Sequence, residues 1–163
     1  MSQPNKIARI VHRLNTLPLG KRLLTLAMGR MIPYVGWSGL EILEMTEDVV
    51  SIRVKNRPTT RNHIGQVHAA AMILVAESAS GLVVGMNVSD TSLPLIKTLN
   101  TKFIKRSKGA ITATATLTPE QKALFAQEKG DLPVQVTVTD ESGGAPILVE
   151  AIWAWVPNKK KPT

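Results

Sequence analysis

Hydrophobic residues in the first part of the chain recur every three or four positions. This spacing predicts an amphipathic helix that begins at Lys6 and includes Leu14. Pro18 and Gly20 then interrupt the helical pattern. Residues 21–31 predict a second short helix, which Pro33 and Gly36 end. The apolar positions of the first helix are Ile7, Ile10, Val11 and Leu14. The pattern favours packing of these helices on a sheet. The alternative is that they lie at a membrane interface, because Arg9 and Arg13 lie between the apolar positions.

From residue 39 onward the period changes to two, which is typical of strands. Residues 39–55 predict a hairpin that turns at Glu47 and Asp48. In its second strand one face carries Val50, Ile52 and Val54. Further strands are predicted over residues 97–106, 111–117, 133–139 and 147–156. Thr118, Pro119 and Glu120 predict a short helical insertion, and residues 141–144 a turn.

Residues 65–84 consist of good helix formers and are apolar on nearly every face. A helix that is apolar all round is buried. It therefore requires a curved antiparallel sheet wrapped around it, and the fold class is α+β. We predict three segments: an N-terminal helical part (1–36), one sheet-and-helix domain (37–157) and a basic tail (158–163).

Composition narrows the function classes. The chain has 163 residues and no cysteine, which excludes disulfides, thiolate metal sites and a cysteine nucleophile, and the cytoplasm is the plain expectation. The net charge of +8 indicates an anionic partner. Nucleic acid is disfavoured because aromatic residues, the usual stacking platforms, make up only 4% of the chain. We expect neither a signal peptide nor a membrane span.

Glu77 is the most informative residue. Between His68 and Asp90 it is the one side chain that is charged at neutral pH, and it lies in the apolar helix. A buried, unpaired carboxylate is costly, so such a group is a candidate general base or nucleophile. The alternative is that Glu77 reaches solvent or a structural partner.

Polar residues and a glycine precede the same helix. Asn62, His63, Gly65 and His68 lie at its expected entrance, where free N–H groups and the helix dipole can polarise a carbonyl. An ordinary capping loop would have a similar sequence. Neither histidine has a second ligand at metal spacing, so we expect no metal site.

The run Asn62-x-x-Gly65-x-x-His68-Ala69-Ala70, followed by Glu77, resembles the hotdog-fold thioesterases of the phenylacetate-pathway type, in an uncharacterised branch of that superfamily. The resemblance implies a hotdog fold, a site between two subunits and hydrolysis of an acyl-CoA thioester. It implies that Glu77 is the catalytic carboxylate, with Asn62, Gly65 and His68 as the positioning and carbonyl-polarising group. The family pattern has His-Gly-Gly and an Asp where this chain has His68-Ala69-Ala70 and Glu77.

A basic segment follows further on. Lys102, Lys105 and Arg106, with His63, are candidates to hold the phosphates of coenzyme A, which would be part of the substrate, with no separate cofactor. Lysines that protect a strand edge against aggregation are the alternative. Trp153 and Trp155 share a face, and we expect them to pack in the core or between subunits.

Three functions stay open. The first is acyl-CoA hydrolysis by a homodimer or a tetramer of dimers, with the acyl chain lying along the central helix. The second is a hydratase or dehydratase that uses His68 and Glu77 as an acid/base pair. The third is a non-catalytic acyl-CoA or lipid-binding module whose basic N-terminal helices contact an anionic membrane, the less favoured partner.

Overall fold

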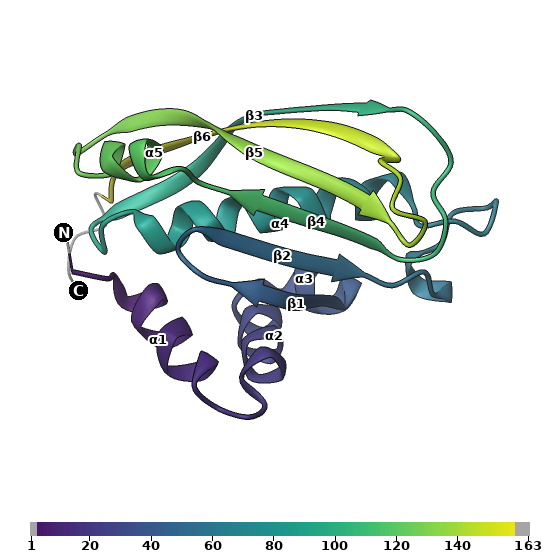
Figure 1. Cartoon of the computed structure of the whole chain (residues 1–163), viewed down its shortest axis with the longest axis horizontal. Coiled ribbons are helices and arrows are strands. Elements are labelled where there is room, and N and C mark those ends of the chain that lie inside the picture. The colour runs from purple at the N-terminus through teal and green to yellow at the C-terminus, as the bar shows by residue number, and fades with distance from the viewer. Residues whose placement is uncertain (1–2, 159–163) are drawn as a thin grey trace.

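The computed structural model describes residues 3–158 and consists of six strands, one long helix and several short helices (Figure 1). The predicted tail falls almost wholly on residues 159–163, which lie outside the described residues. The helices are α1 (Lys6–Asn15), α2 (Gly20–Met31), α3 (Pro33–Ser38), α4 (Ala69–Asn87) and α5 (Pro119–Leu124), with a 3-10 turn at Pro58–Thr60. The strands are β1 (Leu40–Met45), β2 (Val49–Val54), β3 (Ser92–Phe103), β4 (Ile111–Thr116), β5 (Gly130–Asp140) and β6 (Ile147–Pro157).

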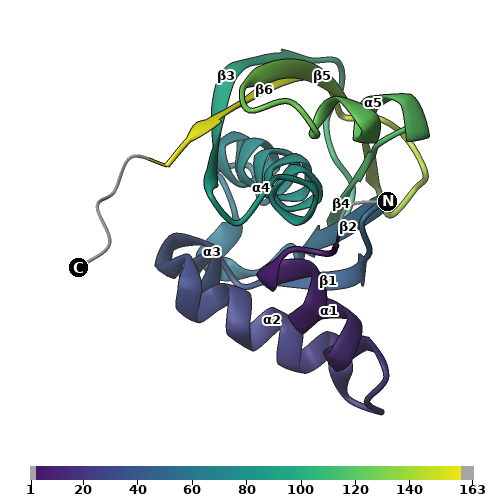
Figure 2. The same cartoon turned by 90° about the vertical axis from the view of Figure 1, so that its left-hand side faces the viewer.

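The six strands form one antiparallel sheet in the order β1-β2-β4-β5-β6-β3. Seen along its axis, α4 lies inside the curve of this sheet (Figure 2). The predicted α+β hotdog fold, a curved antiparallel sheet around one central helix with helices at the N-terminus, is therefore confirmed. β1 and β3 are the two edges of the sheet, and α2 packs beside β1.

The inner face of the sheet and α4 form one hydrophobic core. Val50, Ile52 and Val54 are fully buried, as the period of two predicts. Trp153 and Trp155 are buried as well, which confirms their expected place in the core. The Trp155 ring lies 4.8 Å from the Phe125 ring, centroid to centroid, and its Nε1 donates to the carbonyl of Gln127.

The central helix begins later than the sequence pattern predicts. It starts at Ala69 rather than Gly65, because residues 61–67 form a tight loop closed by a bridge between Arg61 and Val67. By length and composition α4 could also cross a membrane, and it is the one helix of the described chain that could. Most of it is buried by the sheet, which is typical of a core helix.

Two further boundaries differ from the predictions. Pro33 begins a third helix, α3, instead of only ending the second, since a proline fits the first position of a helix. β3 begins at Ser92 rather than Lys97 and includes Pro94. A proline is tolerated there because β3 is an edge strand with one side free of ladder hydrogen bonds.

Candidate active site

One stripe of α4 is left partly uncovered by the sheet. Ala70 is exposed, and Ile73, Leu74, Glu77 and Gly81 are half-buried. Their spacings of three, four and seven residues place them on one face of the helix. On this side the sheet ends at the free edge of β3, and α3 lies on the other border (Figure 2). The stripe is the part of the helix that a ligand or a second protein chain can reach.

Glu77 lies in the middle of this stripe and has little electrostatic support. The one hydrogen bond to its carboxylate within the described chain comes from the hydroxyl of Ser78, which donates to Oε2 at 3.4 Å, and no cation pairs with the carboxylate there. Burial raises the pKa of Glu77 above its ordinary value of 4.5, and the Ser78 hydrogen bond opposes this shift. A half-buried carboxylate with a raised pKa and no counter-ion is suited to accept a proton.

The helix turn after Glu77 is shaped by Trp153. The indole Nε1 donates to Ser80 Oγ at 3.0 Å, and Ser80 Oγ in turn donates to the backbone carbonyls of Ala76 and Glu77. The ring lies against Gly81, where a Cβ atom would come within 2.7 Å of it. Glycine therefore allows the indole to lie directly on the helix, one turn beyond the carboxylate.

The loop before the helix is organised by Asn62. Its Oδ1 accepts from the amides of Ile64 and Gln66 at 3.1 and 3.0 Å. Gly65 has a φ of 77°, which favours glycine, and its own amide donates to the carbonyl of Asn62. The Gly65 amide is thus used inside the loop, and Gly65 lies four residues before the helix rather than at its entrance.

His68 is the N-cap of α4. Its Nδ1 accepts from the amide of Ala70 at 3.0 Å, which places the proton of the neutral ring on the exposed Nε2. The amides of Ala71 and Met72 donate to the His68 carbonyl. The amide of Ala69 has no acceptor within the described chain, so it is the free N–H group at the positive end of the helix.

His68 and Glu77 of one chain do not meet. Nine residues of α-helix, at a rise of about 1.5 Å each, separate them by roughly 13 Å along the axis. An acid/base pair between these two side chains in a single subunit, as the hydratase interpretation requires, is therefore inconsistent with the structure. A neighbouring chain would have to supply one of the two groups.

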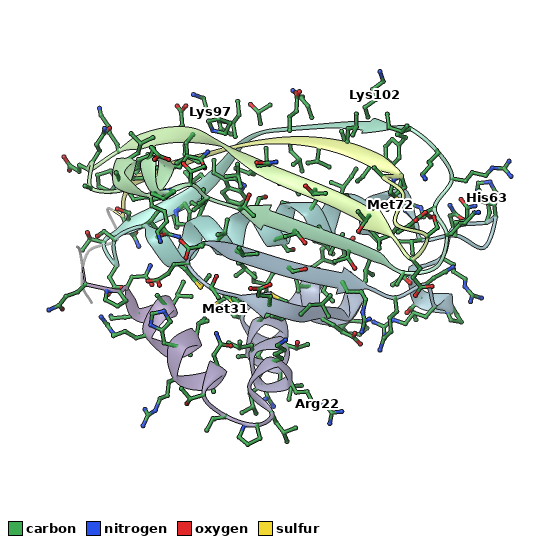
Figure 3. The ribbon with its side chains drawn as sticks, in the orientation of Figure 1. Arg22, Met31, His63, Met72, Lys97 and Lys102 are labelled. Carbon is green, nitrogen blue, oxygen red and sulfur yellow. The ribbon has the colours of Figure 1, made fainter. Side chains whose placement is uncertain are left out.

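The predicted phosphate-binding residues gather at the end of the molecule where α4 begins. His63 and Lys102 both project from this end (Figure 3). Lys105 and Arg106 are exposed in the loop that follows β3. None of these three cations forms an ion pair within the described chain. The positive end of the helix and these side chains together make this end of the fold basic.

The sequence pattern did not single out two aromatic residues beside the same helix entrance. Tyr34 and Trp37 of α3 line a cavity of about 370 Å³ together with His68 and Ala71, and Trp37 is 87% exposed. No pattern in the sequence marked them, because Tyr34 and Trp37 lie beside Pro33 and Gly36, where no apolar period assigns a side chain to a buried or an exposed face. Within residues 3–158, no three His, Asp or Glu side chains lie close enough together to hold a metal ion.

This architecture defines a hotdog protein. A Pseudomonas aeruginosa protein of unknown function, described as a probable thioesterase, has the same fold, with a TM-score of 0.75, 23% identity, and coverage of 86% of this chain and 97% of that one. A Haemophilus influenzae thioesterase matches at TM-score 0.65 and 13% identity, covering 85% and 94%. A Staphylococcus aureus thioesterase matches at 0.63 and 17%, covering 77% and 99%.

A family assignment follows from the sequence itself. Residues 20–156 match the family described as "Domain of unknown function (DUF4442)", and the chain belongs to this family. No curated protein matches the sequence.

Proposed function

We propose that this protein hydrolyses an acyl-CoA thioester in a site shared by two subunits. The observation that carries the proposal is the half-buried, unpaired carboxylate of Glu77 on the uncovered stripe of α4. Glu77 removes a proton from water, the resulting hydroxide adds to the thioester carbonyl carbon, and the carbon–sulfur bond breaks to release the thiolate, which takes up a proton. Direct attack by the carboxylate, followed by hydrolysis of the anhydride, uses the same residue.

The shape of the molecule supports a dimer. β3 is a twelve-residue strand with one free edge, and Leu93, Leu95 and Ile96 on it are large apolar residues that are 40–45% exposed. The unpaired N–H and C=O groups on such an edge can form hydrogen bonds with a strand of another chain. We propose that two copies pair along β3, which continues the sheet and brings the uncovered stripes of both α4 helices face to face.

This pairing would bring the helix entrance of one chain close to Glu77 of the other, although the two lie far apart within a single chain. If the two helices run antiparallel and cross at Ile73, residue 69 of one helix lies opposite residue 77 of the other, because position 73 is midway between them. The free amide of Ala69 then polarises the thioester carbonyl while Glu77 of the second chain activates the water. His68 offers its Nε2 proton beside the same site, and Asn62 keeps the entrance loop in shape.

The basic end provides a place for the phosphates of coenzyme A. His63, Lys102, Lys105 and Arg106 are exposed around the helix entrance, where the carbonyl would bind. Charged donors on flexible side chains are suited to phosphate groups. The acyl chain would then extend along the uncovered stripe past Ile73 and Leu74.

A spacing in a structural neighbour supports the same residues. The Staphylococcus aureus thioesterase has been crystallised with a glutamine replaced by alanine and, separately, with a glutamate replaced, and these positions are fifteen residues apart in that protein. Asn62 and Glu77 are separated by the same number of residues. The two replaced positions of that protein and the pair Asn62 and Glu77 thus have equal spacing along their chains.

The test is steady-state hydrolysis of short, medium, long and aromatic acyl-CoAs by the wild type, Glu77→Gln and Glu150→Gln. Glu150 is exposed on β6, so it provides the same chemical change away from the site. We expect Glu77→Gln to lower kcat by about 10²- to 10⁴-fold and Glu150→Gln to leave it unchanged. Absence of turnover on every substrate, or equal rates for all three proteins, would favour the non-catalytic acyl-binding module.

A further inference from the structure

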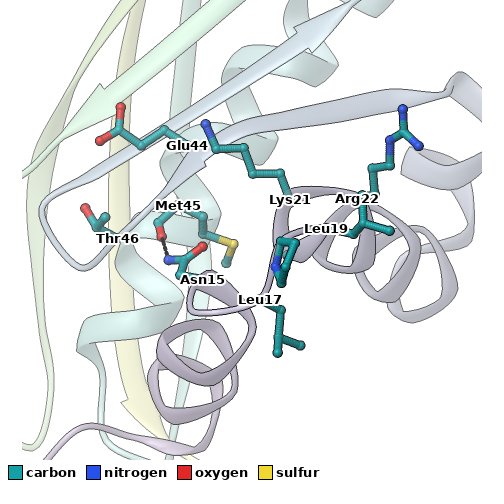
Figure 4. A pocket seen from close by; sticks show the side chains of 10 residues that line it. Asn15, Leu17, Leu19, Lys21, Arg22, Glu44, Met45 and Thr46 are labelled. Atoms are coloured by element: carbon teal, nitrogen blue, oxygen red, sulfur yellow. Dashed lines mark hydrogen bonds between the residues drawn. The ribbon is translucent and has the colours of Figure 1, made fainter.

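The hairpin of α1 and α2 has an inner face that explains its packing. Ala8 and Val11 of α1, and Leu24 and Met28 of α2, are buried against β1 and α4. α1 thus contacts α4, and α2 contacts β1. Asn15 fixes the turn between them, because its Nδ2 donates to the carbonyl of Met45 on β1 at 2.9 Å (Figure 4).

The outer face of the same hairpin is apolar to an extent that packing does not explain. Five large side chains on it are 46–59% exposed, and they come from α1, the connecting turn and α2. We call these residues and the cations between them the hairpin surface. Its apolar members are Ile10, Leu19, Leu26 and Met31, with Leu17 beside them in the turn, pointing away from the sheet (Figure 4).

The charges on this part of the chain all have one sign. Residues 1–40 contain six Lys or Arg residues and no Asp or Glu, while the whole chain has a net charge of +8. Arg9 is engaged with Asp90. The other five cations, Lys6 among them, form no ion pair within residues 3–158. Four of these five complete the hairpin surface: Arg13, Lys21, Arg22 and Arg30. Arg22 lies near the start of α2 (Figure 3), where it also lines a hollow between α2 and β1.

A narrow apolar groove opens on the hairpin surface. It lies between α1 and α2, has a volume of about 120 Å³, and is lined entirely by apolar side chains. Ile10 of α1 and Met31 of α2 contribute to this lining and are both more than half exposed. The groove therefore offers space for a few methylene groups between the two basic helices.

We infer that the hairpin surface docks on a membrane that contains anionic lipid, with its apolar side chains at the boundary between headgroups and acyl chains. Basic residues interleaved with leucine, isoleucine and methionine on one face suit this environment, since the cations attract the headgroups and the apolar groups enter below them. A two-fold contact between copies through this face would instead bring cations of both hairpins together. The inference is independent of thioester hydrolysis.

The first measurement is co-sedimentation of the full chain with vesicles of phosphatidylcholine alone and of equal parts phosphatidylcholine and phosphatidylglycerol. We expect binding to the anionic vesicles only, weakened by added salt. The test variant is Arg13→Glu/Arg22→Glu/Arg30→Glu. The control, Lys102→Glu/Lys105→Glu/Arg106→Glu, changes the net charge equally at the other end of the fold. The hairpin variant should lose about 100-fold or more in affinity, at about fivefold per cation, and the control should lose less than tenfold.

A second variant tests the apolar part without changing charge. Leu26→Gln/Met31→Gln keeps good helix formers at exposed positions, so the fold is preserved, and it should also lower vesicle affinity by more than tenfold. The inference is overturned if both charge-reversal variants lose binding equally, if neutral vesicles bind as well as anionic ones, or if none bind. It is also overturned if Leu26→Gln/Met31→Gln changes the molar mass in sedimentation, because the surface would then be a contact between copies.

Discussion

Gly81 provides a quantitative test of how the helix next to Glu77 is packed. A Cβ atom at this position would lie 2.7 and 2.8 Å from two ring atoms of Trp153, which is too close for either group to keep its place. Trp153 is only 6% exposed and is held by its hydrogen bond to Ser80. The Gly81→Ala substitution must therefore displace a confined ring or break that bond.

The expected cost can be compared with the gain in helix propensity. Overpacking of a well-packed core costs about 1–3 kcal/mol, and loss of the Ser80 hydrogen bond about 1 kcal/mol. Replacing glycine by alanine inside a helix gains about 1 kcal/mol. The net effect of Gly81→Ala is a loss of roughly 1–3 kcal/mol in the free energy of unfolding.

Gly85 is the matched control on the same helix. A Cβ there would have no atom within 4 Å, so Gly85→Ala gains propensity without a clash and should stabilise the protein. Urea and thermal unfolding measure both variants, and we expect the melting temperatures to lie on opposite sides of the wild type, by about 2–4 °C for each kcal/mol. If Gly81→Ala is as stable as Gly85→Ala, the described contact of Trp153 with α4 is wrong.

Three further outcomes are expected. Ile73→Asp places two carboxylates at the proposed helix crossing, so sedimentation should show monomers in place of dimers and hydrolysis should be lost; an active dimer would contradict the pairing. Because the pKa of Glu77 is raised in the folded protein, its ionisation destabilises the fold as pH rises above 4.5. Urea unfolding at neutral pH should therefore show Glu77→Gln to be more stable than the wild type. A less stable Glu77→Gln would refute this reasoning. Hydrogen bonds, first from the Ser142 hydroxyl, lower the pKa of Asp140 from 3.8 to about 2, so the stability lead of wild type over Asp140→Asn should disappear between about pH 4 and about pH 2; a constant lead would contradict it.

The elements that the sequence predicted best are those with an uninterrupted pattern. The alternation in β2 is compatible only with a strand that buries a single face. The apolar run of α4 is compatible only with a helix that is buried on nearly every face. Glu77 was identified as a candidate for a similar reason, since burying a single unpaired charge in an apolar helix costs free energy.

The boundaries and the geometry of the site could not be read in this way. Gln66, Val67 and His68 are compatible with a helix, but the bridge between Arg61 and Val67 and the Asn62 side chain, which accepts from two loop amides, delay the start of α4 to Ala69. Nor does any residue pattern predict that the Gly65 amide donates to the Asn62 carbonyl inside the loop. The separation of His68 from Glu77, on which the proposal of a shared site rests, became evident only once the residues between them were known to be helical.

The central claim, a site shared between two chains, is tested most directly by complementation of two inactive variants. Glu77→Gln removes the carboxylate. Ala69→Pro removes the free amide, and proline is tolerated because Ala69 is the first residue of α4. In a mixed dimer, the helix entrance of the Glu77→Gln chain faces the intact Glu77 of the other chain, so one complete site is restored.

Each variant alone should lose about 10²-fold or more in kcat. When the two are unfolded together in equal amounts and refolded, half of the dimers are mixed and each has one good site, so we expect about a quarter of the wild-type activity to return. No recovery in the refolded mixture, with mixed dimers shown to be present, would contradict a site shared between subunits.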